Sequence, residues 1–355
     1  MLSDSRNNNN YPIPVRNIKS HISNGVNKKT LFVVLIFLAF PLFDRNQYHL
    51  EVLVNAGIYA ILALGLNVMT GYCGLLNLGY AAFFAAGAYA YALLNVNWGW
   101  SFWASLPACV FCAGVLGLVF GSCALRLRGD YLAVVTLGFG EITRVTLNNL
   151  DALTGGPNGL SAAHPVLGFS GRGLDFGINS LPYYYLTLFA IMVVAMITFR
   201  LSLSRLGRGW IAIKEDEVAA ACMGINTGRL KLLAFCIGCA IAGIAGWLFA
   251  GKQGFVSPES FDFVTSIMIA AMLVLGGIGS IPGAIAGAAA LTIIPELLQP
   301  LQQYRIFLFG GVMIVMMLFR PQGLFGGRRI LEEFKPQTER VRQEEDEVLS
   351  EDLRQ

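Results

Sequence analysis

Charged residues are scarce in this chain. Asp, Glu, Lys and Arg make up 13% of its 355 residues, whereas hydrophobic residues make up 55% and the mean hydropathy is +0.60. Because soluble domains carry about 25% charged residues, this composition excludes a water-soluble enzyme and places the chain in a lipid membrane. The formal net charge of +3 is small, and we expect no nucleic acid among the partners.

Motifs for nucleotide, metal and covalent chemistry are also missing. The chain lacks the phosphate-binding loop G-x-x-x-x-G-K-[ST], a dinucleotide fingerprint and a nucleophile elbow. The three histidines are scattered: His21, His49 and His164. Two C-x-x-C pairs lie inside apolar runs, where small buried residues are expected rather than metal or redox sites: Cys109/Cys112 and Cys236/Cys239. We therefore predict a protein that is not an enzyme, has no catalytic residue, and binds no metal or cofactor of its own.

Long apolar runs take the place of such motifs. Ten of them follow one another: Thr30–Phe43, Leu50–Met69, Asn77–Leu94, Phe102–Leu125, Tyr131–Leu150, Tyr183–Leu203, Lys231–Ala250, Phe263–Ile278, Pro282–Leu298 and Tyr304–Phe319. A helix that crosses a bilayer needs about 20 apolar residues, and several of these runs are near the lower limit of about 17. We therefore expect an all-α polytopic membrane protein with about eight to ten transmembrane helices.

The positive residues predict how these helices are oriented. Lys and Arg gather in cytoplasmic loops, and here they cluster in the first 29 residues and after the fourth, sixth and tenth runs. All these clusters fall on the same side if the first run leads outward. We therefore expect both termini in the cytoplasm, a loop outside at 151–182 and a loop inside at 204–228. The expected divisions are a disordered tail over 1–29, a membrane domain over 30–320 and a charged tail over 321–355.

Glycine-rich turns occur twice in similar settings. The segment from Gly71 reads GYCGLLNLGYAAFFAAGA, and the segment from Gly276 reads GGIGSIPGAIAGAAA. Small residues also recur at G-x-x-x-G spacing in two pairs: Gly117/Gly121 and Gly283/Gly287. Such pairs let helix backbones approach closely in membranes. Close helix packing is favoured over an internal duplication as the explanation of both patterns.

The fifth run carries an acid and a base into the membrane. Glu141 and Arg144 lie three residues apart, so both face the same side of a helix and can neutralise each other. A charge at mid-bilayer costs about 2.5–3.5 kcal/mol even on the mildest scale. We interpret the pair either as a structural ion pair or as part of a face that meets a partner helix or a water-filled path.

The predicted inner loop has helical periodicity of its own. Four apolar residues can share one side of a single helix there: Trp210, Ile213, Ala220 and Met223. A charged stretch lies between them at 214–217, and Gly224 ends the helix as a C-terminal glycine does. A channel or simple carrier needs no amphipathic helix in the cytoplasm, whereas a subunit that is driven by a soluble motor does.

Over residues 50–325 the chain resembles the M-type membrane subunit of bacterial branched-chain amino acid ABC importers. The segments that carry the resemblance are GLNVMTGYCGLLNLGYAAFFAAGAYAYALL, LRLRGDYLAVVTLGFGEITR, NNLDALTGGPNGLS, GRGWIAIKEDEVAAACMGI, LFAGKQGFVSPESF, LVLGGIGSIPGAIAGA and FRPQGLFG. The resemblance implies a multi-pass permease in the bacterial inner membrane. It implies as partners a second, H-type permease, two ATPase subunits that bind the ATP, a periplasmic solute-binding protein and an amino acid substrate.

The resemblance also implies that the inner loop is the coupling segment that docks on an ATPase. Coupling segments of such importers resemble E-A-A-x-x-x-G. In this chain Val218-Ala219-Ala220 precedes Gly224 at that spacing, and Glu217 comes one position early. The residues expected to couple the chain to the ATPase are Lys214, Glu215, Asp216, Glu217, Gly224 and Arg229.

A zwitterionic amino acid needs polar partners during passage. Six residues within or near the runs are candidates for the translocation path: Asn67, Thr70, Asn77, Thr136, Glu141 and Arg144. Each of them can instead bond a neighbouring helix. The resemblance favours branched-chain or other hydrophobic and neutral amino acids, with urea or short amides as the alternative. Two other classes stay open: an ion-driven secondary carrier with Glu141 as its proton site, and a structural or receptor subunit.

Overall fold

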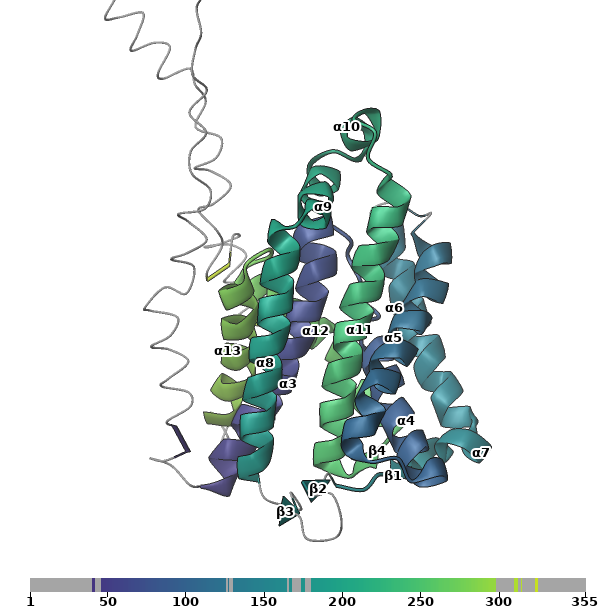
Figure 1. The fold of residues 1–355 in the computed structure, drawn as a ribbon, viewed down its shortest axis with the longest axis vertical. Coiled ribbons are helices and arrows are strands. Elements are labelled where there is room, and N and C mark those ends of the chain that lie inside the picture. The colour runs from purple at the N-terminus through teal and green to yellow at the C-terminus, as the bar shows by residue number, and fades with distance from the viewer. Residues whose placement is uncertain are drawn as a thin grey trace, which may run out of the picture. The chain divides into compact units, whose positions relative to one another are not determined.

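The described part of the chain is mostly helical in the computed structural model. The residues that the structure describes are 40–41, 46–125, 127, 130–164, 166–167, 174–175, 180–297, 310–311, 314 and 323–324. Within them it forms eight helices of 14 residues or more (Figure 1): α3 (Gln47–Leu66), α4 (Ala81–Trp98), α5 (Phe102–Ala124), α6 (Asp130–Asn149), α8 (Ser180–Leu203), α11 (Thr227–Gln253), α12 (Phe263–Gly276) and α13 (Ile281–Leu297). The all-α polytopic prediction is confirmed.

These helices coincide with eight of the ten apolar runs. By length and composition, four stretches in the described part of the chain can each cross a membrane: Gln47–Tyr72, Phe102–Ala124, Ser180–Leu203 and Thr227–Gln253. Helices α12 and α13 are apolar but shorter. The first and last runs, 30–43 and 304–319, lie outside the described residues apart from 40–41, 310–311 and 314. The expected tails also lie outside them, apart from 323–324.

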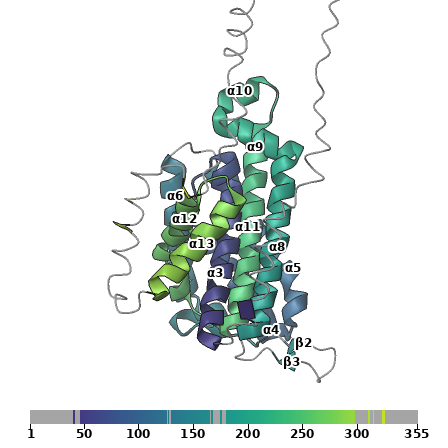
Figure 2. The ribbon, with the colours of Figure 1, turned by 90° about the vertical axis from the view of Figure 1, so that its left-hand side faces the viewer.

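Helix α11 is the helix around which the others pack. It lies against α5, α4 and α3, and α3 in turn contacts α8 and α13 (Figures 1 and 2). Glycines permit this closeness, since a Cβ added at Gly87 of α4 would lie 2.6 Å from the Cα of Gly243. The predicted G-x-x-x-G pair of α13 acts in the same way, because a Cβ at Gly283 would lie 2.5 Å from the Gly276 carbonyl of α12.

Two of the four cysteines in C-x-x-C pairs are buried where α5 meets α11, namely Cys109 and Cys239. Cys236 is half-buried. Cys112 is exposed, so the expectation of a buried residue was wrong for it. The buried face of α5 continues from Cys109 through Ala113 in steps of four residues, and Cys112 lies off this face.

The helix that begins with α3 breaks inside the membrane domain before α4 starts. A π-helix, η1 (Asn67–Tyr72), follows α3, and the chain is then non-helical up to Tyr80. Backbone groups away from water need partners, and η1, α6 and α12 supply them: Leu75 N donates to Met69 O at 3.0 Å, Leu78 N to Thr136 Oγ1 at 3.1 Å and Ala81 N to Ser266 Oγ at 3.0 Å.

Short elements gather at opposite ends of the long helices (Figure 1). One end, called the outer end below, holds α7 (Asp151–Thr154), η2 (Gly156–Asn158), η3 (Pro258–Phe261) and two antiparallel strand pairs, β1 (Leu160–Ser161) with β4 (Phe255–Val256) and β2 (Val166–Leu167) with β3 (Leu174–Asp175). The other end holds α9 (Arg205–Glu215) and α10 (Glu217–Cys222). The loops at 151–182 and 204–228 are therefore on opposite sides, as expected.

Candidate coupling loop and outer cavity

The inner loop consists of two helices, so the prediction of one helix over 210–223 was wrong. Asp216 separates them with extended backbone, at φ −154° and ψ 114°. Its Oδ1 accepts hydrogen bonds from Val218 N at 2.7 Å and Ala219 N at 3.0 Å, which caps α10. An aspartate side chain that bonds nearby N–H groups competes with the helix, and this competition starts a new helix at Glu217.

The break also changes which residues share a side. Trp210, Ile213 and Ala220 are buried, whereas Met223 is 83% exposed, so the four residues do not share one side as predicted. Gly224 ends α10 as predicted, with φ at +82°. Gly224 N donates to Ala221 O and Ile225 N donates to Ala220 O, the pair of bonds that closes a helix on a left-handed residue.

Three contacts attach this α9–α10 loop to the membrane helices. Trp210 Nε1 donates to Leu230 O in α11 at 2.9 Å. Lys231 Nζ lies 2.6 Å from Glu217 Oε1. Lys214 Nζ donates to Gly71 O in η1 at 2.9 Å. Two of the six expected coupling residues, Lys214 and Glu217, therefore bind the chain's own membrane part.

The rest of the expected coupling set lies on the surface. Glu215, Asp216, Gly224 and Arg229 are exposed. Two apolar side chains are exposed beside them: Val218 by 64% and Met223 by 83%. Met223 was expected on the apolar side of a single helix, and its exposure follows from the break at Asp216. That this surface docks on an ATPase stays a prediction.

Four candidate path residues surround the break between α3 and α4. Asn67 Oδ1 accepts from Gly279 N at 2.8 Å, and Thr70 Oγ1 donates to Leu75 O at 2.9 Å. Asn77 Oδ1 accepts from Gly79 N at 2.9 Å, and Thr136 accepts from Leu78 N. Each side chain thus supports non-helical backbone. Their part in a translocation path stays a prediction.

The other two candidates, Glu141 and Arg144, form the ion pair that their spacing predicts. Arg144 Nη2 lies 3.0 Å from Glu141 Oε2, and both side chains are about one-third exposed, at 34% and 36%. Glu141 also borders a shallow depression beside Asp262 and Ser266. Other side chains of α6 are more open, such as Tyr131 and Ile142. The pair therefore lies on a face of α6 that the described residues only partly cover.

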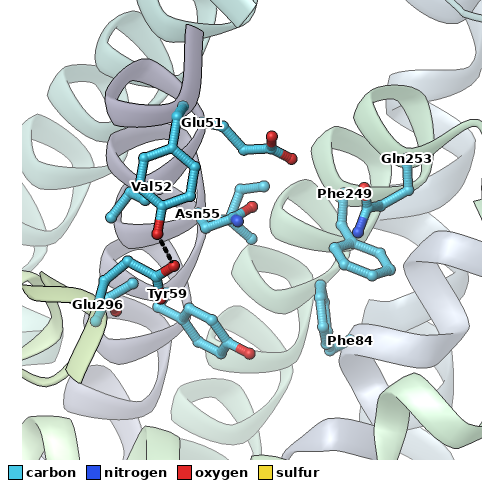
Figure 3. Close-up of a pocket in the computed structure, with 11 residues that line it drawn as sticks. Glu51, Val52, Asn55, Tyr59, Phe84, Phe249, Gln253 and Glu296 are labelled. Atoms are coloured by element: carbon cyan, nitrogen blue, oxygen red, sulfur yellow. Dashed lines mark hydrogen bonds between the residues drawn. The ribbon is translucent and has the colours of Figure 1, made fainter. Parts of the chain in front are cut away.

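A cavity of about 380 Å³ lies at the outer end, among α3, α4, α11 and α13. We call it the outer cavity. Its lining is Tyr48, Glu51, Val52, Asn55, Ile58, Tyr59, Phe84, Phe249, Gln253, Thr292 and Glu296. Figure 3 shows Glu51 and Asn55 of α3 facing Gln253 and Phe249 of α11. None of the six candidate path residues lines it.

The charged residues in and beside this cavity were not among the predicted site residues. Glu51, Lys252 and Glu296 lie at the ends of three different apolar runs. A charged residue at such a position usually marks only where a membrane helix ends. Lys252 Nζ donates to Asn55 Oδ1 at 2.8 Å and to Glu51 Oε1 at 3.2 Å. The Tyr48 hydroxyl donates to Glu296. The sequence offered one signal that these residues meet: each lies at the end of its run that is on the side predicted to be outside.

Known proteins resemble this chain over most of its length. The family described as branched-chain amino acid transport system / permease component matches residues 48–319. The high-affinity branched-chain amino acid transport system permease protein LivM of Escherichia coli (strain K12) is 43% identical over 320 residues, covering 84% of this chain and 75% of that protein. LivH of the same organism is 26% identical over 318 residues, covering 84% and 99%.

Pseudomonas aeruginosa has a further relative, the high-affinity branched-chain amino acid transport system permease protein BraD. It is 27% identical over 315 residues, covering 83% of this chain and 98% of that protein. No solved structure matches the chain significantly. The match of the family to residues 48–319 and the identity to LivM extend over the broken helix, the α9–α10 loop and the outer cavity alike. The chain therefore belongs to the family of branched-chain amino acid transport system permease components.

Proposed function

We propose that this chain is one of two permease subunits in an ATP-driven importer of branched-chain or other hydrophobic amino acids. Its relatives LivM and LivH are named as permease proteins of one high-affinity transport system in Escherichia coli. In this proposal an H-type permease completes the pore, two ATPase subunits bind ATP, and a periplasmic solute-binding protein delivers the amino acid. The complex lies in the bacterial inner membrane, with both termini of this chain in the cytoplasm.

The α9–α10 loop is the observation that carries this proposal. It stands beyond the ends of the membrane helices (Figure 1) and presents Val218 and Met223 to the surroundings. In this proposal the ATPase covers these two apolar side chains when it docks on the loop. Trp210 donates a hydrogen bond to α11, and Glu217 forms an ion pair with Lys231 of α11. These two contacts hold the loop in place against the membrane helices.

The contact between Lys214 and η1 suggests how motion reaches the pore. When ATP closes the two ATPase subunits, the loop moves with the ATPase on which it docks. Lys214 connects the loop to the Gly71 carbonyl at the end of η1, and η1 is followed by the non-helical segment up to Tyr80. Helix breaks of this kind change conformation at lower cost than continuous helices, since hinges are a few residues at element ends.

The test is uptake of leucine into proteoliposomes that hold this chain with the second permease and the ATPase subunits. ATP is enclosed, and the solute-binding protein and radioactive leucine are added outside. We expect accumulation that requires both ATP and the binding protein. Uptake driven by an ion gradient without the ATPase subunits would instead identify a secondary carrier. Accumulation of urea or a short amide in place of leucine would identify the alternative substrate class.

A further inference from the structure

The outer cavity lies within one subunit, although a pore shared by two permeases needs no such space. It is lined by α3, α4, α11 and α13 of this chain, and its volume is about 380 Å³. Ligand sites in proteins measure about 300–1,000 Å³ and combine an apolar lining with a few placed polar groups. The cavity is at the lower end of this range, which suits a single small molecule.

Charged groups line one part of the outer cavity. Two carboxylates, from Glu51 and Glu296, border the space. The nearby ammonium of Lys252 bonds Glu51, and the Lys252 side chain is 6% exposed whereas Glu51 is 49% exposed. Two carboxylates and one ammonium leave a net charge of −1. Glu51 can therefore accept a further hydrogen bond from a cationic group, while Lys252 is positioned behind it near Asn55.

Aromatic and aliphatic groups line the other part. Phe84 and Phe249 meet edge to face, with ring centroids 5.2 Å apart, and Ile58 and Val52 of α3 border the same space. Figure 3 shows Phe84 and Phe249 on the side opposite Val52. A ligand that fills the cavity must therefore be polar and charged at one end and apolar at the other.

We propose that the outer cavity binds one hydrophobic amino acid as a zwitterion. Its ammonium is held between Glu51 and Glu296, its carboxylate faces the side-chain amide of Gln253, and its side chain packs on Phe84 and Phe249. The inference rests on the proposed function for its substrate class. It adds a binding site inside this subunit, close to the side from which the solute-binding protein delivers its cargo.

A single cysteine in the cavity tests the proposal. Val52→Cys is placed in the complete importer and modified from outside with a membrane-impermeant thiol reagent, without ATP or binding protein. The unsubstituted chain gives the background labelling. Leucine should slow the modification of Val52→Cys, whereas methylammonium and acetate, each of which carries one half of the charge pattern, should not at the same concentration.

Charge variants show whether the named groups hold the amino acid. In the Val52→Cys background, Glu51→Gln should raise the leucine concentration that gives half-protection about tenfold or more, because hydrogen bonds to charged groups are the strong ones. Glu259→Gln is the matched control, since this exposed glutamate lies on η3 and does not line the cavity. It should leave the protection by leucine unchanged.

The outcomes separate this inference from the proposed function. Absence of protection in an importer that accumulates leucine with ATP would overturn the cavity site and leave the proposed function standing. Equal protection by methylammonium or sodium would also overturn it, because the cavity would then be a cation site only. Protection by leucine that Glu51→Gln weakens would support the site, even if ATP-driven uptake were not observed. An unchanged labelling rate of Val52→Cys in the absence of leucine shows that Glu51→Gln leaves the cavity intact, and the weakened protection then reports on the lost charge.

Discussion

At the scale of single residues, the attachment of the α9–α10 loop depends on hydrogen bonds to backbone carbonyls. Lys214 donates to Gly71 O at the end of η1, and Trp210 donates to Leu230 O in α11. The lysine reaches a different helix from the tryptophan, so the loop is bonded on two sides. A charged donor on a carbonyl is worth about 1.5–3 kcal/mol, and the proposed transmission from the loop to η1 relies on this contact.

Replacing Lys214 by Met should uncouple transport from ATP hydrolysis. Met keeps an unbranched stem but cannot donate to Gly71 O, so loop motion no longer reaches η1. We expect leucine uptake to fall about tenfold or more while the complex still hydrolyses ATP. Arg205→Met is the control, because Arg205 is an exposed cation on the same helix and lies outside the expected coupling set. Equal uptake by the Lys214 and Arg205 variants would show that the contact with Gly71 carries no motion.

Gly224 is predicted to tolerate Asn but not Val. Its φ is +82°, and no atom lies within 4 Å of an added Cβ, so backbone conformation alone limits the substitution. The left-handed conformation costs about 1–2 kcal/mol for ordinary L-residues and less for Asn. Gly224→Val should therefore reduce solute-stimulated ATP hydrolysis and uptake, with normal subunit stoichiometry. Gly224→Asn should stay close to wild type, and a loss of the same size in both variants would contradict this explanation.

At the scale of elements, α6 and the break before α4 support each other. Thr136 in the middle of α6 accepts from Leu78 N in the non-helical segment, and its own hydroxyl donates to Ala133 O at 2.8 Å. The non-helical segment thus depends on α6 for a hydrogen-bond acceptor, because water does not reach this buried site. Helix α6 also carries the Glu141–Arg144 pair on a partly open face. The same helix therefore supports the non-helical segment on one side and presents an ion pair on another.

Thr136→Val should destabilise the permease more than Thr136→Ser. Val has nearly the shape of Thr but leaves Leu78 N unpaired, and a buried unpaired donor costs about 1–3 kcal/mol. Ser keeps the hydroxyl and removes only a methyl group. Thermal unfolding of the detergent-purified complex, followed by size-exclusion chromatography after heating, compares the two. A lower midpoint for Ser than for Val would contradict the role of the hydroxyl.

The Glu141–Arg144 pair is tested by a double-mutant cycle. Glu141→Gln or Arg144→Gln alone leaves one unpaired charge in the membrane domain, so each should reduce recovery of the assembled complex. The two changes together should restore part of the loss, because contacting residues usually couple by about 0.5–3 kcal/mol. Co-purification of the second permease is the measurement. Strict additivity of the two losses would favour a direct contact of Glu141 with the solute.

At the scale of the whole molecule, native cysteines test the proposed orientation. Cys222 is exposed on α10, so an impermeant maleimide should label it only after cells are permeabilised. Ser161→Cys on β1 should be labelled in intact cells, because β1 lies at the opposite end. Labelling of Cys222 in sealed cells would reverse the orientation.

Cys73 provides an internal control that should resist labelling over a defined range of pH. It is buried just beyond the span that ends at Tyr72, and burial raises its pKa to about 12, with a smaller opposing effect of Lys231. Only the thiolate reacts with maleimide, and a raised pKa keeps the thiol protonated at neutral pH. Cys73 should therefore stay unlabelled on both sides from pH 7 to 9. Mass spectrometry of the labelled peptides checks this.

The sequence alone determined the features that depend on near neighbours in the chain or on the solvent. Apolar runs become helices because lipid offers no hydrogen-bond partners, and the runs from Leu50 to Leu298 could be placed for this reason. Gly224 as a helix end and the Glu141–Arg144 pair were also predictable, since both follow from helix geometry over a few residues. The family resemblance rested on the same local segments.

Only the tertiary structure decided which distant residues meet. The bond between Asn67 and Gly279 joins positions 212 residues apart, and Lys214 reaches Gly71 across 143. The outer cavity draws Glu51, Phe249 and Glu296 from three helices, and no local pattern records that these helices are neighbours. Their arrangement follows from the packing of α3 between α11 and α13, because lipid-embedded helices associate through close contacts that a local sequence pattern does not record.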